Sequence, residues 1–207
     1  MKPILLYSIA ILLTSGCTKR SNCNGGNMGS TDAFPNKVGD TWVYKVSDTL
    51  DNGNIRTVSQ YNMNVSITGT VTLPGGIMAT TWVYDYLNTA DTNYVYQTGD
   101  TIKFLDATKS YPVRQYIIPI MLHNSWQYIP GVSDVTIIEQ GNISVGGNNF
   151  PNAFHLNGSA GLPDAIFEID EWIENNVGVV KRYINPSGEL IIVKHYISWS
   201  LISYHLV

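Results

Sequence analysis

Cys17 is the residue whose chemistry the sequence states most clearly. It follows an apolar segment of about ten residues (4–13) and a Thr-Ser-Gly run, and Lys2 provides a positive charge before that segment. A basic start, a short apolar core and small residues before the break are the features of an export signal, and a thiol directly after them can be acylated. We therefore expect residues 1–16 to be a lipoprotein signal peptide and Cys17 to carry lipid such as palmitate. An ordinary secretory signal with an incidental cysteine is the alternative.

Residues 17–31 are rich in Ser, Asn and Gly. Such a composition buries too little apolar surface to offset chain entropy, so it predicts a flexible tether. The second cysteine, Cys23, lies in this tether, and we expect it to have no role. No acidic run follows Cys17, which favours a location in the cell envelope at the outer membrane, facing the periplasm; the cell surface is the alternative. The expected contact with the membrane is the N-terminal lipid.

The charge of the chain argues against one class of partner. Removal of residues 1–16 takes away Lys2 and no acidic residue, so the formal net charge moves from −4 to −5. A nucleic-acid-binding protein needs a basic face to displace counterions from phosphates, so we expect no nucleic-acid partner. The remaining length is common for one β-rich domain, and we place that domain at residues 32–207.

Alternating apolar and polar residues indicate β-strands along most of this domain. The clearest case is the stretch from Gln60 to Leu73, where one parity holds Tyr61, Met63, Val65, Ile67, Val71 and Leu73. Gly69 interrupts this parity and predicts a bulge where the sheet curls. The other strand segments expected are 42–46, 79–87, 94–97, 102–105, 132–139, 143–145, 153–156, 165–173, 178–184 and 190–204. The predicted fold class is all-β: an antiparallel, strongly curled sheet forming a barrel or half-barrel of about ten strands.

Two segments of the chain echo each other. Pro35, Trp42 and Tyr44 recur with the same spacing as Pro119, Trp126 and Tyr128. Trp and Tyr two residues apart on a strand point to the same face, so these pairs are expected to be core aromatics at the starts of strands, with contact to a ligand as the alternative. Two such matches also suggest a duplicated half-sheet.

These Pro-x(6)-Trp-x-Tyr openings, together with a late Trp172-Ile-Glu-Asn-Asn-Val-Gly-Val-Val-Lys181 segment, resemble a pattern in uncharacterised Gram-negative lipoproteins. The resemblance implies an antiparallel half-barrel domain, distantly similar to the lipoprotein carriers LolA and LolB. The helices that cover the concave sheet of those carriers have no counterpart in this sequence, and no ligand residue is transferred from them.

The remaining polar residues favour structure over catalysis. The four histidines lack any spacing typical of metal ligands, and residues 48–54 are interpreted as a hairpin turn because Leu50 occupies a position where a calcium loop needs an oxygen ligand. In the one acidic cluster, Glu168 and Asp170 would lie on one side of a strand and Glu171 on the other. We expect a solvated sheet face there, and we expect neither a metal, a cofactor nor an enzymatic activity.

Aromatic residues are the remaining candidates for binding. Trp82, Tyr84 and Tyr86 share one face of a strand. Flat rings with polar tips suit glycans, lipids and proteins, and they also suit a β-sheet core. The leading hypothesis is a lipid-anchored, non-enzymatic envelope protein with a hydrophobic ligand, a lipid or acyl chain, in a cavity lined by Tyr61, Met63, Val65 and Ile67. The alternative is a surface module that displays Trp82, Tyr84 and Tyr86 to a glycan or an envelope protein.

Overall fold

The computed structural model describes residues 34–162, 165–187 and 194–207. The predicted signal peptide, the tether, Cys17 and Cys23 lie outside the described residues. Within the described ranges the secondary structure is β-strand, and no helix there could cross a membrane.

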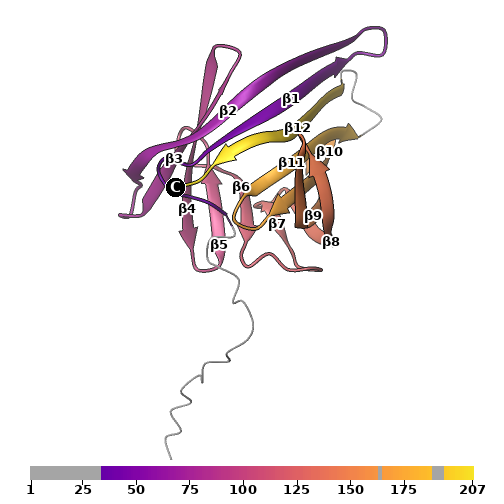
Figure 1. Ribbon diagram of the computed structural model, residues 1–207. Helices are drawn as coiled ribbons and strands as arrows, with labels where there is room; N and C mark the ends of the chain where they lie inside the picture. Colours follow the sequence, from indigo (N-terminus) through magenta and orange to yellow (C-terminus); the bar gives the residue numbers. More distant parts are fainter. Residues whose placement is uncertain (1–33, 163–164, 188–193) are drawn as a thin grey trace, which may run out of the picture.

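Twelve strands form one antiparallel sheet (Figure 1). They are β1 (Thr41–Asp51), β2 (Arg56–Thr72), β3 (Met78–Tyr86), β4 (Thr89–Thr98), β5 (Thr101–Leu105), β6 (Pro112–Ile117), β7 (Ser125–Ile129), β8 (Ser133–Val145), β9 (Asn148–Leu162), β10 (Ala165–Glu174), β11 (Gly178–Ser187) and β12 (Lys194–His205). Each strand pairs with the next in sequence, except that β6 does not pair with β7, and β1 pairs with β12. The sheet thereby curls into a nearly closed barrel, as predicted.

The described residues form twelve strands, whereas the sequence predicted about ten. The prediction missed two edge strands and divided a third strand into two segments. The predicted segments 132–139 and 143–145 are parts of one strand, β8, whose pairing with β9 is shifted by bulges. Strands β6 and β7 were absent from the predicted set. Strand β6 begins at Pro112 and is followed by Pro119, and prolines interrupt the alternation that predicts a strand. A proline is nevertheless tolerated at the start of an edge strand, because no donor to the ladder is needed there.

Side chains close the barrel where the backbone ladder is missing. Between the edge strands β6 and β7, Gln115 Nε2 donates to the carbonyl of Gln127 at 2.8 Å. In the opposite direction, Trp126 Nε1 donates to the carbonyl of Gln115 at 2.8 Å. These bonds join the two edges and satisfy polar groups that an open edge would leave to water.

The repeated Trp and Tyr residues are core aromatics at strand starts, as predicted. Trp42 and Tyr44 on β1, and Trp126 and Tyr128 on β7, are all buried. Strands β1 and β7 each begin a run of six consecutively paired strands. Trp42 stacks on Trp82 of β3, with ring centroids 4.9 Å apart, and its indole nitrogen donates to the carbonyl of Val177 at 2.7 Å. The middle of the barrel is therefore packed, and only about 20 Å³ of free space remains there.

The bulge predicted at Gly69 is present, and it divides the apolar face of β2. Ile67 pairs with Trp82 and Gly69 pairs with Thr81, so β2 has one extra residue at this point. Before the bulge, Val65 and Ile67 belong to the main core inside the barrel. After it, Val71 and Leu73 pack with Ala79, Leu105, Tyr94 and Tyr96 in a separate cluster. The expectation that all six apolar residues from Tyr61 to Leu73 face one side is therefore wrong beyond Gly69, because one extra residue reverses the alternation relative to the neighbouring strand.

The turn between β1 and β2 is a hairpin turn, as the sequence analysis interpreted it. Asp51 Oδ1 accepts the backbone N–H of Gly53, and Asn52 Oδ1 accepts those of Asn54 and Ile55. The oxygens that a calcium loop would direct at an ion are used by the turn itself. The long β1–β2 hairpin projects beyond the other strands at the upper right of Figure 1.

Candidate functional site

One end of the barrel holds a cavity of about 550 Å³, which we call the mouth cavity. It lies where β1 ends and β12 begins, so the side chains of several strands converge on it. Its lining comprises Asp48, Tyr61, Met63, Tyr84, Tyr86, Asp91, Thr92, Asn93, Asp106, Ala107, Val113, Arg114, Arg182, His195, Ile197 and Trp199. Its size falls in the range of roughly 300–1,000 Å³ typical of small-molecule sites.

Aromatic rings form much of the wall of the mouth cavity. Tyr61 of β2 stacks on Tyr86 of β3, with ring centroids 5.9 Å apart and planes inclined by 23°. Trp199 of β12 lies 6.4 Å from the ring of Tyr84, and the guanidinium of Arg182 lies over Trp199 at 4.3 Å. Such rings offer flat apolar surface with polar tips, which suits the body of an amphipathic molecule.

A buried polar network lies at the inner end of the cavity. Glu171 of β10 and Arg182 of β11 are paired across the ladder and form an ion pair. Tyr116 donates a hydrogen bond of 2.9 Å to Glu171, and Tyr128 also donates to it, while Arg182 Nη2 donates to Tyr128 at 2.8 Å. Glu171 is fully buried, with 0% of its surface exposed, and Arg182 is 3% exposed. Their charges are thus compensated inside the barrel, as buried charges require.

This network corrects the expectation of a solvated acidic cluster. The predicted alternation holds, because Glu171 lies on the opposite side of β10 from Asp170, but the side that holds Glu171 is the packed interior. Asp170 contacts His155 of β9, whose ring stacks on Trp172 at 4.3 Å. Sequence reasoning found neither the burial of Glu171 nor its partner Arg182. An acidic residue opposite an arginine on neighbouring strands is a signal only once the strand register is known.

Burial sets the proton affinities within this network. Burial is the largest cause that raises the pKa of Tyr116, and the neighbouring Glu171 carboxylate raises it further. Burial is the largest single effect on Arg182 and would lower its pKa, but the attractions of Glu171 and of the neighbouring tyrosines together outweigh it and raise the pKa well above its usual value. Arg182 therefore stays charged and the phenol of Tyr116 stays neutral at ordinary pH.

Arg114 of β6 is the second guanidinium at the mouth cavity. One of its terminal nitrogens donates to the hydroxyl of Tyr84, and the guanidinium lies over the ring of Phe104 at 4.1 Å. Its Nε is buried and has no hydrogen-bond partner. Among the described residues, no carboxylate forms an ion pair with Arg114.

The carboxylates of the cavity rim all have donors of their own. Asp48 bonds to His195 Nε2 at 2.6 Å, and Asp91 accepts the hydroxyl of Tyr86. Asp106 accepts hydrogen bonds from the Thr108 hydroxyl and from the backbone of the β5–β6 turn, and these bonds lower its pKa. The rim is therefore negatively charged and its acids are held in place.

The predicted ligand-binding residues divide between the cavity and the packed core. Tyr61, Met63, Tyr84 and Tyr86 line the mouth cavity. Val65 and Trp82 border only the narrow space in the middle of the barrel, and Ile67 belongs to the core cluster. The structure corrects the expectation that Trp82 and Tyr84 are displayed on the surface, because each is only 5% exposed. Their shared face is the interior of the barrel.

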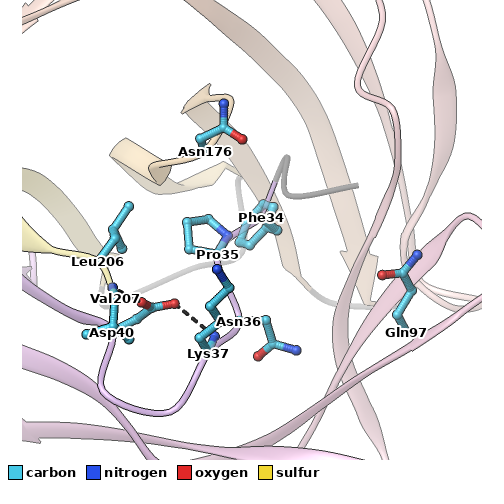
Figure 2. Close-up of a pocket in the computed structure, with 9 residues that line it drawn as sticks. All are labelled: Phe34, Pro35, Asn36, Lys37, Asp40, Gln97, Asn176, Leu206 and Val207. Atoms are coloured by element: carbon cyan, nitrogen blue, oxygen red, sulfur yellow. Dashed lines mark hydrogen bonds between the residues drawn. The ribbon is translucent and has the colours of Figure 1, made fainter. Parts of the chain in front are cut away.

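A second cavity, of about 430 Å³, lies at the opposite end of the barrel (Figure 2). Phe34, Pro35 and Asn36 line it from one side, and Leu206 and Val207 line it near the C-terminus. Asp40 holds this end together, because its carboxylate accepts the backbone N–H groups of Lys37 at 2.8 Å and Val207 at 3.0 Å. This cavity is built from the chain ends and lacks the ring of aromatic walls, so the mouth cavity is the better candidate site.

Of three comparisons with known proteins, only the one with solved structures found similar chains. Neither protein-family models nor curated proteins match the sequence. Among solved structures, a protein assigned as a lipoprotein in Parabacteroides distasonis ATCC 8503 is similar at a TM-score of 0.45 and 16% identity, over 83% of this chain and 97% of that one. A protein assigned as exported in Bacteroides fragilis NCTC 9343, with a YmcC-like fold, gives 0.40 and 9%, over 83% and 98%. A DUF1329 family protein of Desulfovibrio piger ATCC 29098 gives 0.28 and 11%, over 82% and 86%. At these TM-scores the similarities carry no argument about function.

In the described ranges, no group of three or more His, Cys, Asp or Glu side chains is placed to hold a metal ion. Four polar residues of the rim already have hydrogen-bond partners. Asp48 and His195 bond to each other, Asp91 bonds to Tyr86, and Asp106 bonds to the backbone of its own turn. The mouth cavity offers aromatic surface, hydrogen-bonding hydroxyls and the guanidiniums of Arg114 and Arg182.

Proposed function

We propose that this chain is a lipid-anchored, non-enzymatic protein of the cell envelope that binds a small amphipathic ligand in the mouth cavity. The observation that carries the proposal is the contrast between the two parts of the barrel interior. The middle is packed, whereas about 550 Å³ stays free at one end beneath aromatic walls. A barrel that served only as a structural element would gain stability by filling this volume with side chains.

The proposed ligand differs from a deeply enclosed acyl chain. Val65 and Ile67, which were expected to line the cavity, are packed in the core, so a chain cannot run along the full length of β2. The free volume lies between Tyr61, Tyr86 and Trp199, close to the surface. A compact molecule with a planar or short apolar body fits this space best.

The proposed anchor acts at the other end of the barrel. Phe34 is the described residue closest in sequence to Cys17, and it lines the cavity opposite the mouth (Figure 2). Lipid on Cys17 would attach the domain to the outer membrane from this end, and the periplasmic face is the proposed orientation, with the cell surface as the alternative. The mouth would then receive its ligand from the aqueous phase. Nucleic acid is not a proposed partner.

Ligand binding can be tested with a neutral aromatic probe, N-phenylnaphthylamine, whose fluorescence rises in apolar surroundings. We expect saturable binding with one site per chain. Ala107→Trp should abolish it, because Ala107 is exposed on the β5–β6 turn and lines the cavity, so a large ring there occupies the mouth. The matched control is Ala90→Trp, which adds the same ring at an exposed position of β4 outside the lining. No saturable binding, or equal loss in both variants, would overturn the proposal.

The anchor is tested separately. Cys17→Ser should move the full-length protein from the detergent phase to the aqueous phase after export, because serine lacks the thiol that is acylated. Cys23→Ser is the control and should leave partitioning unchanged. If Cys17→Ser still partitions into detergent, the lipid anchor is wrong, whatever the probe shows.

A further inference from the structure

Arg114 presents an unbalanced charge inside the barrel. Among the described residues, its Nε is buried without a hydrogen-bond partner, and the one side chain that accepts from its guanidinium is Tyr84, through its hydroxyl. Arg114 is half-buried, and a cation withdrawn from water without a counterion is unfavourable. The face of Phe104 below the guanidinium recovers part of this cost, since a cation is attracted to the face of an aromatic ring.

The neighbouring charges do not compensate Arg114. Two carboxylates are buried among the described residues: Asp40 accepts backbone N–H groups at the opposite end of the barrel, and Glu171 is bonded to Arg182, Tyr116 and Tyr128. The carboxylates of the rim are bonded to His195, Tyr86 and the β5–β6 turn. Within the described residues, the inner end of the mouth cavity thus carries two guanidiniums and one carboxylate.

We propose that the ligand of the mouth cavity is an amphipathic anion whose carboxylate or phosphate group pairs with Arg114. This inference rests on the proposed function and names the chemical class of the ligand. A guanidinium presents a planar fork of donors that matches the two oxygens of such groups. The anion would pair with the terminal nitrogens of the half-buried guanidinium and balance its charge.

The distribution of charge also sets the orientation of the ligand. Asp48, Asp91 and Asp106 place negative charge at the rim, whereas Arg114 and Arg182 place positive charge further in. In the bound state an anionic group is less favourable at the rim than at the inner end, so the anionic group of the ligand lies inward. The apolar body then lies between Tyr61, Tyr86 and Trp199. A cationic group would be attracted at the rim and repelled at the inner end.

The experiment compares two probes with the same aromatic body. N-Phenylnaphthylamine is neutral, and anilinonaphthalene sulfonate adds one anionic group to the same ring system. We expect the sulfonate to bind about tenfold more tightly or better, since a hydrogen bond to a charged group contributes about 1.5–3 kcal/mol. Arg114→Gln should remove this preference while leaving the neutral probe bound. The control Arg56→Gln changes an exposed arginine at the start of β2, outside the cavity, and should keep the preference.

The outcomes separate this inference from the proposed function. If both probes bind equally to the unchanged protein, or if Arg114→Gln keeps the preference, the anion inference is overturned and the binding function stands. If neither probe binds, both fall. Displacement of the bound sulfonate by 1-naphthoate or by 1-naphthyl phosphate, and not by 1-naphthol, supports the inference, and the stronger of the two anions indicates whether a carboxylate or a phosphate is preferred. Equal displacement by 1-naphthol would contradict it.

Discussion

Glu171 and Arg182 face each other from directly paired positions on β10 and β11, and together they form the one fully internal ion pair among the described residues. Arg114 lines the same cavity as Arg182 and has no ion pair with a carboxylate of the described residues. Two arginines in one barrel thus differ in whether their charge is compensated, and this difference makes their roles separable by mutation.

Arg182→Met should destabilise the protein strongly. It removes the cation from Glu171, which has no exposure to water, and such a loss typically costs about 3–5 kcal/mol. Arg114→Met is the matched control: it replaces an uncompensated guanidinium with an apolar side chain, so the free energy of unfolding of the ligand-free protein should stay the same or rise. Urea unfolding measures both. Equal destabilisation by the two substitutions would contradict the charge assignment.

Stability should fall above about pH 10 because of buried tyrosines. Burial is the largest cause that raises the pKa of Tyr44, Tyr116 and Tyr128. Below about pH 10, the ordinary value, these phenols are protonated in both the folded and the unfolded state. At higher pH the unfolded chain releases their protons and the folded chain does not, so the free energy of unfolding drops by about 1.4 kcal/mol per pH unit for each tyrosine.

Tyr44→Phe tests this alkaline dependence. The substitution removes one of the three buried phenols. The slope of unfolding free energy against pH should therefore become shallower by the contribution of one tyrosine, about 1.4 kcal/mol per pH unit. Tyr111→Phe is the control, because Tyr111 is 70% exposed and the substitution removes no buried phenol. Urea unfolding at several values between about pH 9 and pH 11 gives the slopes. An unchanged slope in Tyr44→Phe would show that its hydroxyl is not held protonated by the fold.

The turn between β8 and β9 gives a third prediction. Gly146 and Gly147 both have positive φ, 58° and 87°, as tight hairpin turns require. A Cβ on Gly146 would lie 2.0 Å from the carbonyl oxygen of Leu201 on β12, whereas a Cβ on Gly147 would meet nothing within 4 Å.

Gly147→Ala should therefore cost only the backbone strain, about 1–2 kcal/mol. Gly146→Ala adds a steric conflict with the backbone of β12, which should lower the free energy of unfolding by about a further 1–3 kcal/mol. Thermal or urea unfolding of the two variants makes the comparison. If both lose the same stability, the close approach of this turn to β12 is not present in solution.

Much of the fold was predictable from the sequence because it depends on local order. Alternation on β2 identified Val65 and Ile67 as core residues, and Gly69 marked the bulge. The recurring Trp and Tyr pairs marked the starts of β1 and β7 as places of core aromatics, although the set of predicted strand segments left β7 out. The proposed anchor at Cys17 rests on the sequence alone, since it lies outside the described residues. These features need only the period of a strand and the chemistry of the residues concerned.

Closure of the barrel decided what the sequence left open. Alternation tells which residues share a face, but only the pairing of β1 with β12 and the joining of β6 to β7 determine what covers that face. For this reason Glu171, Trp82 and Tyr84 are interior, and Val71 and Leu73 leave the main core after the bulge. The mouth cavity and its uncompensated Arg114 arise from residues far apart in sequence, whose meeting depends on the curl of the whole sheet.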